Sequence, residues 1–307
     1  MSLDEIFANF PSEEDLMNII MHTSSTAWEN TLVEKDIETW LQNFKGEVLE
    51  VKRERLVALW LLSHFTFYNQ DEVTHLCKVV YRDLLHLVIS KTGGTDYKLL
   101  IEDFFSKSNI ISPEKTSGSG GFIAYFFRHE NHLPMTLFNF SIDNVLDTIE
   151  NFLIIDDVTL TAGTDGQLYA FFKKAKAKYP TKNFYLLSLV SSEDAILKLK
   201  TDFNIEVVSA IVLDERDKCF NAKSDIFYSY PDLIPTAKSF AEHYGKKVPI
   251  TDPLGYRDGQ YTFGFFYNTP DNTLPIFWAR VSGWNPILRR YHKNYSGKNY
   301  IGNERFI

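Results

Sequence analysis

The chain has 307 residues, and its 32 Lys and Arg against 40 Asp and Glu leave a formal net charge of −8. This length corresponds to about two domains, at roughly 150 residues each. The acidic balance excludes a global basic field that would collect nucleic-acid backbones, so any contact with nucleic acid is expected to be local or indirect.

The cysteine pattern and the hydropathy indicate the compartment. Cys77 and Cys219 lie far apart without Cys-x-x-Cys or Cys/His spacing, so neither a disulfide framework nor a zinc site is indicated. The first fifteen residues are acidic, and no stretch of 18 apolar residues occurs. We expect a cytoplasmic protein with no membrane segment.

The first ninety residues show helical spacing of apolar residues. The pattern predicts one buried helix over residues 47–67 and a second one that continues to about residue 90, with Asn69 at its N-cap. The run Lys91-Thr92-Gly93-Gly94-Thr95 breaks the pattern. We therefore predict an N-terminal helical domain over residues 1–92 and a second domain over residues 93–307.

Short apolar runs then alternate with helical patterns. Strands are predicted at residues 152–155, 184–190 and 205–213, and helices at residues 166–178 and 192–202. Near-continuous Ile, Val and Leu runs in such an alternation are typical of a parallel sheet buried on both faces. We predict an α/β fold, with residues 219–307 as a hood that closes over the sheet edge.

An acidic pair follows the first of these strands, in the order Asp156-Asp157-Val-Thr-Leu-Thr-Ala-Gly-Thr164. Two carboxylates at a strand end offer acceptors to the vicinal hydroxyls of a ribose. The small residues after them present backbone N–H groups at a helix N-terminus, where a phosphate is favoured. One loop is thus suited to hold both ends of a phosphoribose.

This segment resembles the phosphoribosyl pyrophosphate (PRPP) loop of type I phosphoribosyltransferases. The resemblance implies that Asp156 and Asp157 hold the ribose hydroxyls and steady a Mg²⁺ ion. Nearby carboxylates would also stabilise an oxocarbenium-like transition state. The residues that would cradle the phosphate are Thr159, Thr161, Ala162, Gly163 and Thr164. Leu160 and Ala162 depart from the commoner Thr-Thr-Gly-Gly-Thr motif and reduce the conformational freedom of the loop backbone.

Other readings of the acidic pair remain open. It is also compatible with a solvated strand end, with a Mg²⁺-binding receiver domain or with a Walker B segment. A receiver domain places its acidic pair after its first strand, and a Walker B segment needs an upstream Gly-x-x-x-x-Gly-Lys loop. The glycine-rich run at residues 117–121 has no Lys following it.

That glycine-rich run is a second candidate site. Ser117, Gly118, Ser119, Gly120 and Gly121 offer a flexible nest of backbone N–H groups that could hold pyrophosphate, with Arg128 near it. A plain surface loop is the alternative.

Two C-terminal segments carry a more specific resemblance, Asp252-Pro-Leu-Gly-Tyr256 and Tyr267-Asn-Thr-Pro-Asp-Asn-Thr-Leu-Pro-Ile-Phe-Trp278. They resemble the signature of the phosphoribosyltransferase-like (PRTase-CE) effector family of bacterial conflict systems, among them retron-type antiphage loci. The helices around Trp40 and Trp60 are similar to that family's helical leader. Asn268, Asn272 and Trp278 are candidates for the active site, with Trp278 stacking on a base, or else for packing.

The resemblance implies a toxic effector that binds PRPP or a related compound and acts at C1′ of its ribose. It also implies a reverse transcriptase and a helix-turn-helix protein as partner subunits, and a homo-oligomer is possible. The alternatives are a ribose-phosphate sensor without turnover and a scaffold subunit. The basic, aromatic tail at residues 289–295 fits nucleic-acid contacts or a solvated or subunit-contacting end. The apolar helical leader is expected to bury an interface against the rest of the chain or in an oligomer.

Overall fold

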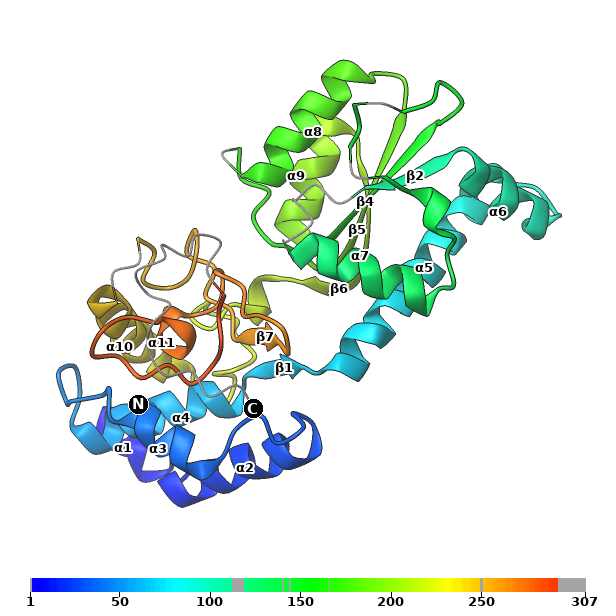
Figure 1. Ribbon diagram of the computed structural model, residues 1–307. Coiled ribbons are helices and arrows are strands. Elements are labelled where there is room, and N and C mark those ends of the chain that lie inside the picture. Colours follow the sequence, from blue (N-terminus) through cyan, green and yellow to red (C-terminus); the bar gives the residue numbers. More distant parts are fainter. Residues whose placement is uncertain are drawn as a thin grey trace.

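The central sheet has five parallel strands in the order β3–β2–β4–β5–β6 (Figure 1). The strands are β2 (Ser108–Ile111), β3 (Phe138–Asn139), β4 (Asn151–Thr159), β5 (Asn183–Ser192) and β6 (Glu206–Leu213). The chain leaves β2 for β3 on one side and leaves β4 for β5 on the other, so the strand order reverses between β2 and β4. Ligands of α/β sheets bind outside the carboxyl ends of the strands at such a point.

Helices cover both faces of this sheet. They are α5 (Gln70–Thr92), α6 (Tyr97–Ser106), α7 (Ser119–Glu130), α8 (Gln167–Lys178) and α9 (Glu193–Phe203). Successive residues of β4 alternate between the faces. Leu153 and Ile155 join a core with α5 and α7, whereas Phe152 and Ile154 join one with α8 and α9. Both faces of the sheet are buried under apolar side chains, which explains the continuous apolar run and confirms the predicted α/β fold with a parallel sheet flanked by helices.

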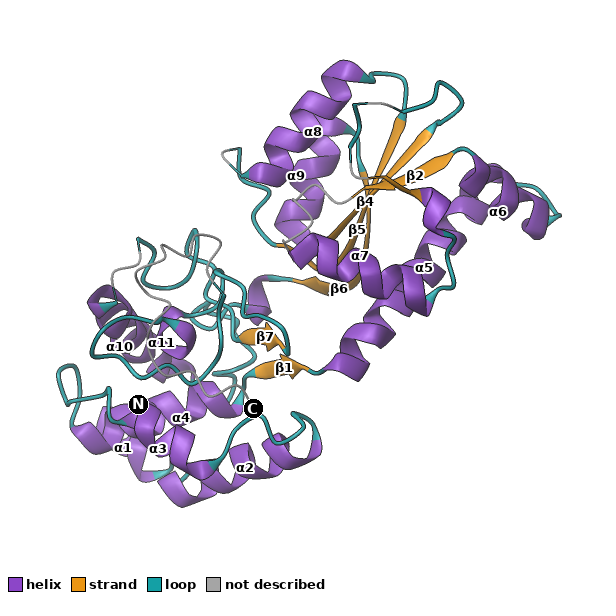
Figure 2. Ribbon diagram, viewed as in Figure 1, coloured by secondary structure: helices purple, strands orange, loops and turns teal. Residues whose placement is uncertain are grey.

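A second body is mainly helical and is built from both ends of the described chain (Figure 2). Its elements are α1 (Leu3–Ala8), α2 (Glu13–Thr26), α3 (Glu34–Leu41), α4 (Val51–Ser63), β1 (Thr66–Tyr68), α10 (Ile234–Lys247), β7 (Phe263–Phe265) and α11 (Pro275–Trp278). Short 3₁₀ turns lie at residues 135–137, 215–217 and 231–233. We call residues 3–68 and 215–291 the helical lobe, and residues 70–213 the sheet lobe.

The two parts of the helical lobe share one hydrophobic core. Buried side chains of α1 to α4 pack directly against those of residues 219–288. The Trp40 indole stacks on Phe277, with ring centroids 5.6 Å apart, and its Nε1 donates to the Ile276 carbonyl at 2.8 Å. The Trp60 Nε1 donates to the Ile226 carbonyl at 3.1 Å. The first 68 residues therefore bury their apolar faces against the C-terminal part of the same chain.

The domain boundary expected at residue 92 stays a prediction, because packing alone does not define which part folds independently. Hydrophobic contacts group the chain differently, since α5 belongs to the core of the sheet lobe and the preceding helices to that of the helical lobe.

The helix predicted over residues 47–67 is shorter in the structure. It begins at Val51 because the buried Glu54 carboxylate accepts hydrogen bonds from the backbone N–H groups of Gly46, Val48 and Leu49, which folds the preceding residues into a loop. It ends at Ser63 because the chain then enters β1, which pairs in parallel with β7. The predicted N-caps Asn69 and Ser192 both cap their helices.

The structure is a computed structural model that describes residues 2–111, 119–139, 141–143, 145–164, 166–248 and 251–291. Within these ranges, no helix has the length and apolar character needed to cross a membrane.

Candidate functional site

A cavity of about 370 Å³ is lined by residues of both lobes, at the carboxyl end of β4. Its size is within the range of small-molecule sites. The sheet lobe contributes Ser119, Gly166 and residues 156–163 and 167–169, and the helical lobe contributes Tyr256, Phe265, Asn268, Pro270, Asp271, Asn272 and Arg290. The cavity therefore coincides with the point where the strand order reverses, and the hood forms its opposite wall.

Asp156 and Asp157 lie inside the last part of β4 rather than after it, because the strand continues to Thr159. Both side chains are half-buried, in contrast to the fully buried residues 151–155 before them. The longer strand follows from the pairing of Val158 and Thr159 with Val190 and Ser191 of β5. The acidic pair is thus fixed by sheet hydrogen bonds on the floor of the cavity.

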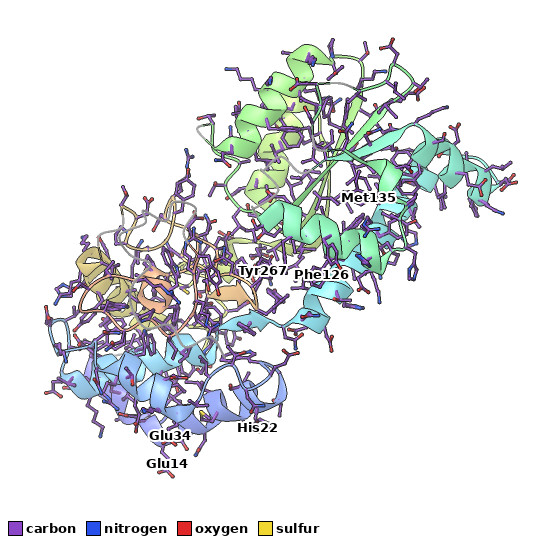
Figure 3. The ribbon with its side chains drawn as sticks, in the orientation of Figure 1. Glu14, His22, Glu34, Phe126, Met135 and Tyr267 are labelled. Carbon is purple, nitrogen blue, oxygen red and sulfur yellow. The ribbon has the colours of Figure 1, made fainter. Side chains whose placement is uncertain are left out.

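The Asp157 carboxylate is held by groups from both lobes. Its Oδ1 accepts hydrogen bonds from the Ser119 hydroxyl at 3.1 Å and from the Val158 N–H at 3.0 Å, and its Oδ2 accepts one from the Tyr267 hydroxyl at 3.2 Å. Tyr267 lies where the lobes meet (Figure 3). Burial, together with the charge of Asp157, raises the pKa of Tyr267 well above its usual value. The tyrosine therefore stays protonated and remains a donor to Asp157.

The turn between β4 and α8 forms another wall. Ala162 has a left-handed backbone with φ of 39°, which is unfavourable for a residue with a Cβ. The Thr159 hydroxyl is buried beside the cavity and makes no hydrogen bond to the described residues. Helix α8 begins after Gly166, which provides no side-chain cap. The N-terminal N–H groups of α8 therefore receive no capping bond from Gly166, and the helix dipole there favours an anion.

Most of the residues predicted from the acidic loop come together here. The residues of the predicted site that line the cavity are Asp156, Asp157, Thr159, Thr161, Ala162, Gly163, Ser119 and Asn268, together with Asn272. Thr164 lies in the same turn without lining the cavity. Ser117 and Gly118 lie outside the described residues.

The second predicted loop has to be corrected in part. Ser119, Gly120 and Gly121 are the first turn of α7 rather than a flexible nest, because Ile123 and Phe127 pack the helix onto β4. Arg128 lies nine residues further along α7, about 13 Å from Ser119 at 1.5 Å per residue. Its guanidinium contacts the His129 ring, at 2.9 Å from Nε2. The structure does not bring Arg128 to the cavity.

Of the C-terminal candidates Asn268 and Trp278, the first lines the cavity and the second does not. Asn268 lines the cavity, and its Oδ1 accepts from the Tyr291 N–H at 3.0 Å. Trp278 does not line it and is 3% exposed, with the Arg290 guanidinium 4.8 Å above its ring and its Nε1 donating to the Thr273 carbonyl. Stacking on a base requires an open ring face, so Trp278 has a packing role in this structure.

Polar residues that line the cavity but were not proposed as site residues from the sequence include Tyr256, Asp271 and Arg290. Arg290 bonds to the Thr269 carbonyl and to Asp271, and burial lowers its pKa. Tyr267 was quoted only as part of a signature. The spacing of Gly255 and Gly259 around Tyr256 indicates a tight turn, which is the signal that could have drawn attention to this segment.

The fold and the cleft define an α/β protein of the kind that binds a small ligand at the reversal of strand order. A sequence model of the PRTase-CE family matches residues 37–290, so the chain belongs to that phosphoribosyltransferase-like family. Among solved structures, the chain is similar to the Helicobacter pylori xanthine-guanine-hypoxanthine phosphoribosyltransferase, at 13% identity and a TM-score of 0.30, over 49% of this chain and 85% of that one. No curated protein matches the chain.

Proposed function

We propose that the cleft binds PRPP or a related phosphoribosyl compound and that the protein acts at C1′ of the ribose. Family membership supports a phosphoribosyltransferase-like function. The observation that carries the finer proposal is the continuity of one cavity from the Asp156–Asp157 pair to residues 160–163 and Gly166. Acceptors for hydroxyl groups thus lie at one end and an anion-favouring helix start at the other.

The protein positions both carboxylates in this proposal. Asp157 accepts hydrogen bonds from Ser119, Val158 and Tyr267. Asp156 accepts the Asp157 backbone N–H through Oδ1 at 3.1 Å. We assign the contact with the ribose 2′ and 3′ hydroxyls to both carboxylates. Both charges favour the positive charge that develops on the sugar ring during glycosyl transfer.

The turn and the start of α8 are assigned to the 5′-phosphate. Backbone N–H groups at residues 161–164 and the positive end of α8 are the donors that a phosphate requires. The unpartnered Thr159 hydroxyl adds a polar group beside the same wall. The first turn of α7, whose Ser119 lines the cavity, is a second helix start and is assigned to the pyrophosphate.

A Mg²⁺ ion fits this donor set only together with its substrate. The described residues contain no group of three or more His, Cys, Asp or Glu that could hold a metal by themselves. Mg²⁺ in phosphate sites is typically held by one or two carboxylates plus the substrate's phosphate oxygens. Asp156 and Asp157 are the carboxylates that would hold it, and the ion would neutralise charge on the leaving pyrophosphate.

The test combines binding and turnover. Wild-type protein is titrated with PRPP and with ribose 5-phosphate by calorimetry, and is incubated with PRPP, NAD and nucleotides while products are followed by chromatography. The double variant Asp156→Asn, Asp157→Asn is expected to lose binding at least about 10-fold, since each charged hydrogen bond contributes about 1.5–3 kcal/mol. The matched control is Asp83→Asn on α5, where the carboxylate pairs with exposed Arg82 away from the cavity lining.

The outcomes separate the competing interpretations. Binding with product formation supports the enzyme. Binding without any product favours a ribose-phosphate sensor. A double variant that binds and reacts like wild type overturns the assignment of the acidic pair. If the double variant unfolds, as judged by circular dichroism, the pair is structural.

We further propose that this protein is the cytoplasmic, toxic effector of an antiphage defence system, restrained by partner subunits. Membership in the PRTase-CE family and the C-terminal signature support this role. A reverse transcriptase and a small helix-turn-helix gene beside this gene are the expected neighbours. Expression alone and together with those neighbours tests the proposal, because toxicity should fall when the partners are present.

A further inference from the structure

A guanidinium from the helical lobe lies directly on the turn that precedes α8. A Cβ built on Gly163 would lie 2.4 Å from Cζ of Arg257 and 2.6 and 2.7 Å from its two terminal nitrogens. Real Cβ contacts are not this short, so only a glycine at position 163 lets the guanidinium approach the backbone. Gly163 itself lines the cavity. The Arg257 side chain does not itself line the cavity, but its guanidinium lies against the turn that was assigned to the phosphate.

The turn that presents Arg257 is tightly constructed. Arg257 and Asp258 both have left-handed backbones, with φ of 54° and 56°. A Cβ on Gly255 or Gly259 would lie 2.3 or 2.5 Å from the Asn272 carbonyl oxygen, so the turn is packed onto the loop that holds Asn272. Two consecutive residues in an unfavourable conformation persist only where their surroundings impose it.

Hydrogen bonds hold Tyr256 in place, and Tyr256 in turn positions the Arg257 guanidinium. The Tyr256 N–H donates to the Asp271 carbonyl at 2.7 Å, and the Asn272 side chain donates to the Tyr256 carbonyl at 3.1 Å. The Tyr256 hydroxyl accepts from Arg257 Nε at 3.2 Å, and the guanidinium carbon lies 5.6 Å from the Tyr256 ring centroid. The guanidinium is thus aimed at Gly163 by a tyrosine that also lines the cavity.

The ligand chemistry follows from the donors. A guanidinium has only donors, arranged in a planar fork that matches two oxygens of a phosphate. The adjacent helix N-terminus also favours an anion. We propose that Arg257 binds the phosphate monoester of the ligand, so that this phosphate is held by the sheet lobe and the helical lobe together. This inference rests on the proposed function and adds a phosphate-binding residue to the same site.

The experiment measures phosphate recognition separately from ribose recognition. Wild type, Arg257→Gln and Arg257→Lys are titrated with ribose 5-phosphate and with inorganic phosphate by calorimetry. Arg257→Gln is expected to weaken ribose 5-phosphate binding by about 10-fold or more, as expected for a lost charge-assisted bond. Arg257→Lys should recover part of this loss, because it keeps the charge without the fork. Arg289→Gln, an exposed arginine of the same lobe, is the matched control.

A second variant tests the contact itself. Gly163→Ala introduces a Cβ where the guanidinium lies, so it should displace Arg257 and weaken ribose 5-phosphate binding. The double variant Gly163→Ala, Arg257→Gln should then bind about as weakly as the weaker single variant, because both changes remove one interaction. Effects that simply add would show two independent roles and overturn the inference.

The results distinguish this inference from the proposed function. Wild type that binds neither ribose 5-phosphate nor PRPP refutes both. Wild type that binds, together with an Arg257→Gln variant of unchanged affinity, refutes only the role of Arg257. Circular dichroism of each variant is recorded first, and Arg257→Lys provides the readout if Arg257→Gln does not fold.

Discussion

Glu54→Gln tests how strongly one buried carboxylate holds the helical lobe together. Glu54 is 0% exposed. Its Oε2 accepts from the Gly46 N–H at 2.7 Å and from the Tyr244 hydroxyl at 2.6 Å, and its Oε1 accepts from the Val48 and Leu49 N–H groups at 2.7 and 3.2 Å. The carboxylate therefore ties the loop before α4 to α10, which is 190 residues distant in sequence.

The magnitude follows from this geometry. In the glutamine variant one of the two oxygens becomes an NH₂ group, which is itself a donor. Whichever oxygen is replaced, two donors in buried or part-buried hydrogen bonds lose their acceptor, at about 1–3 kcal/mol each. We expect the free energy of unfolding to fall by about 4 kcal/mol, which corresponds to a loss of about 10 °C in Tm for a protein of this size.

Tryptophan fluorescence is the appropriate assay, because all five tryptophans belong to the core of the helical lobe or pack against it: Trp28, Trp40, Trp60, Trp278 and Trp284. Urea unfolding followed by this signal reports on that lobe. Glu47→Gln is the control, since Glu47 is exposed and pairs with His243 and Lys247 in solvent-screened ion pairs, so its loss should change the stability little. The reasoning is refuted if Glu54→Gln unfolds within 1 kcal/mol of the control.

Three further predictions address single contacts. Tyr267→Phe removes the hydrogen bond to Asp157 and should lower the free energy of unfolding in urea by about 1.5–3 kcal/mol. A loss no larger than that of the control Tyr228→Phe, at an 85% exposed site, would show that this hydrogen bond contributes nothing to stability. Ala162→Gly removes the Cβ from a residue with a left-handed backbone and should raise the stability of the sheet lobe by about 1 kcal/mol. The control Ala170→Gly, at an exposed position inside α8, should lower that stability by about 1 kcal/mol. Hydrogen exchange of β4 amides measures both variants, and a loss of stability in Ala162→Gly would contradict backbone strain at Ala162. Burial lowers the pKa of His64, and its hydrogen bond to the Trp60 carbonyl opposes this shift. The unfolded chain therefore binds the proton more readily, so the stability of the folded protein should fall as the pH drops through about 6.5. Fluorescence-detected unfolding at pH 7 and 5.5 should show a smaller fall in stability for His64→Gln than for wild type, and an equal fall would exclude His64 as the source.

The sequence predicts the sheet best where the signal is local. The strands β4, β5 and β6 are recognisable because both faces of the sheet are buried, so their apolar runs are continuous. The caps at Asn69 and Ser192 are recognisable because capping depends on residues only three apart.

Prediction is wrong where a distant residue decides the local structure. The loop at residues 47–50 exists because Glu54 and Tyr244 complete a buried network, and no local pattern encodes that pair. The glycines at residues 120 and 121 suggest a loop, but packing of Ile123 and Phe127 on the sheet makes them helical.

One wall of the candidate site could be predicted because its residues are consecutive in the sequence. The wall made by residues 156–163 is one continuous segment with a recognisable motif. The helical lobe brings Tyr267 to Asp157 from 110 residues away, and Arg257 to Gly163 from a similar separation. Such contacts depend on the hood's path, which its Tyr-, Asn- and Pro-rich sequence does not reveal.

The helical lobe is made from two stretches of chain separated by the whole sheet lobe, and this has a consequence during synthesis. A ribosome that has made the first 68 residues must add about 220 more before residue 288 is available, which takes about 10–45 s at roughly 5–20 residues per second. Until residues 219–288 have been made, the apolar surface that α1 to α4 bury against those residues lacks its partner. The sheet lobe, by contrast, is complete by residue 213 apart from the few aromatic side chains that β7 and its neighbours add to its core. The nascent protein thus carries a finished α/β unit while the other wall of its cleft is still being translated.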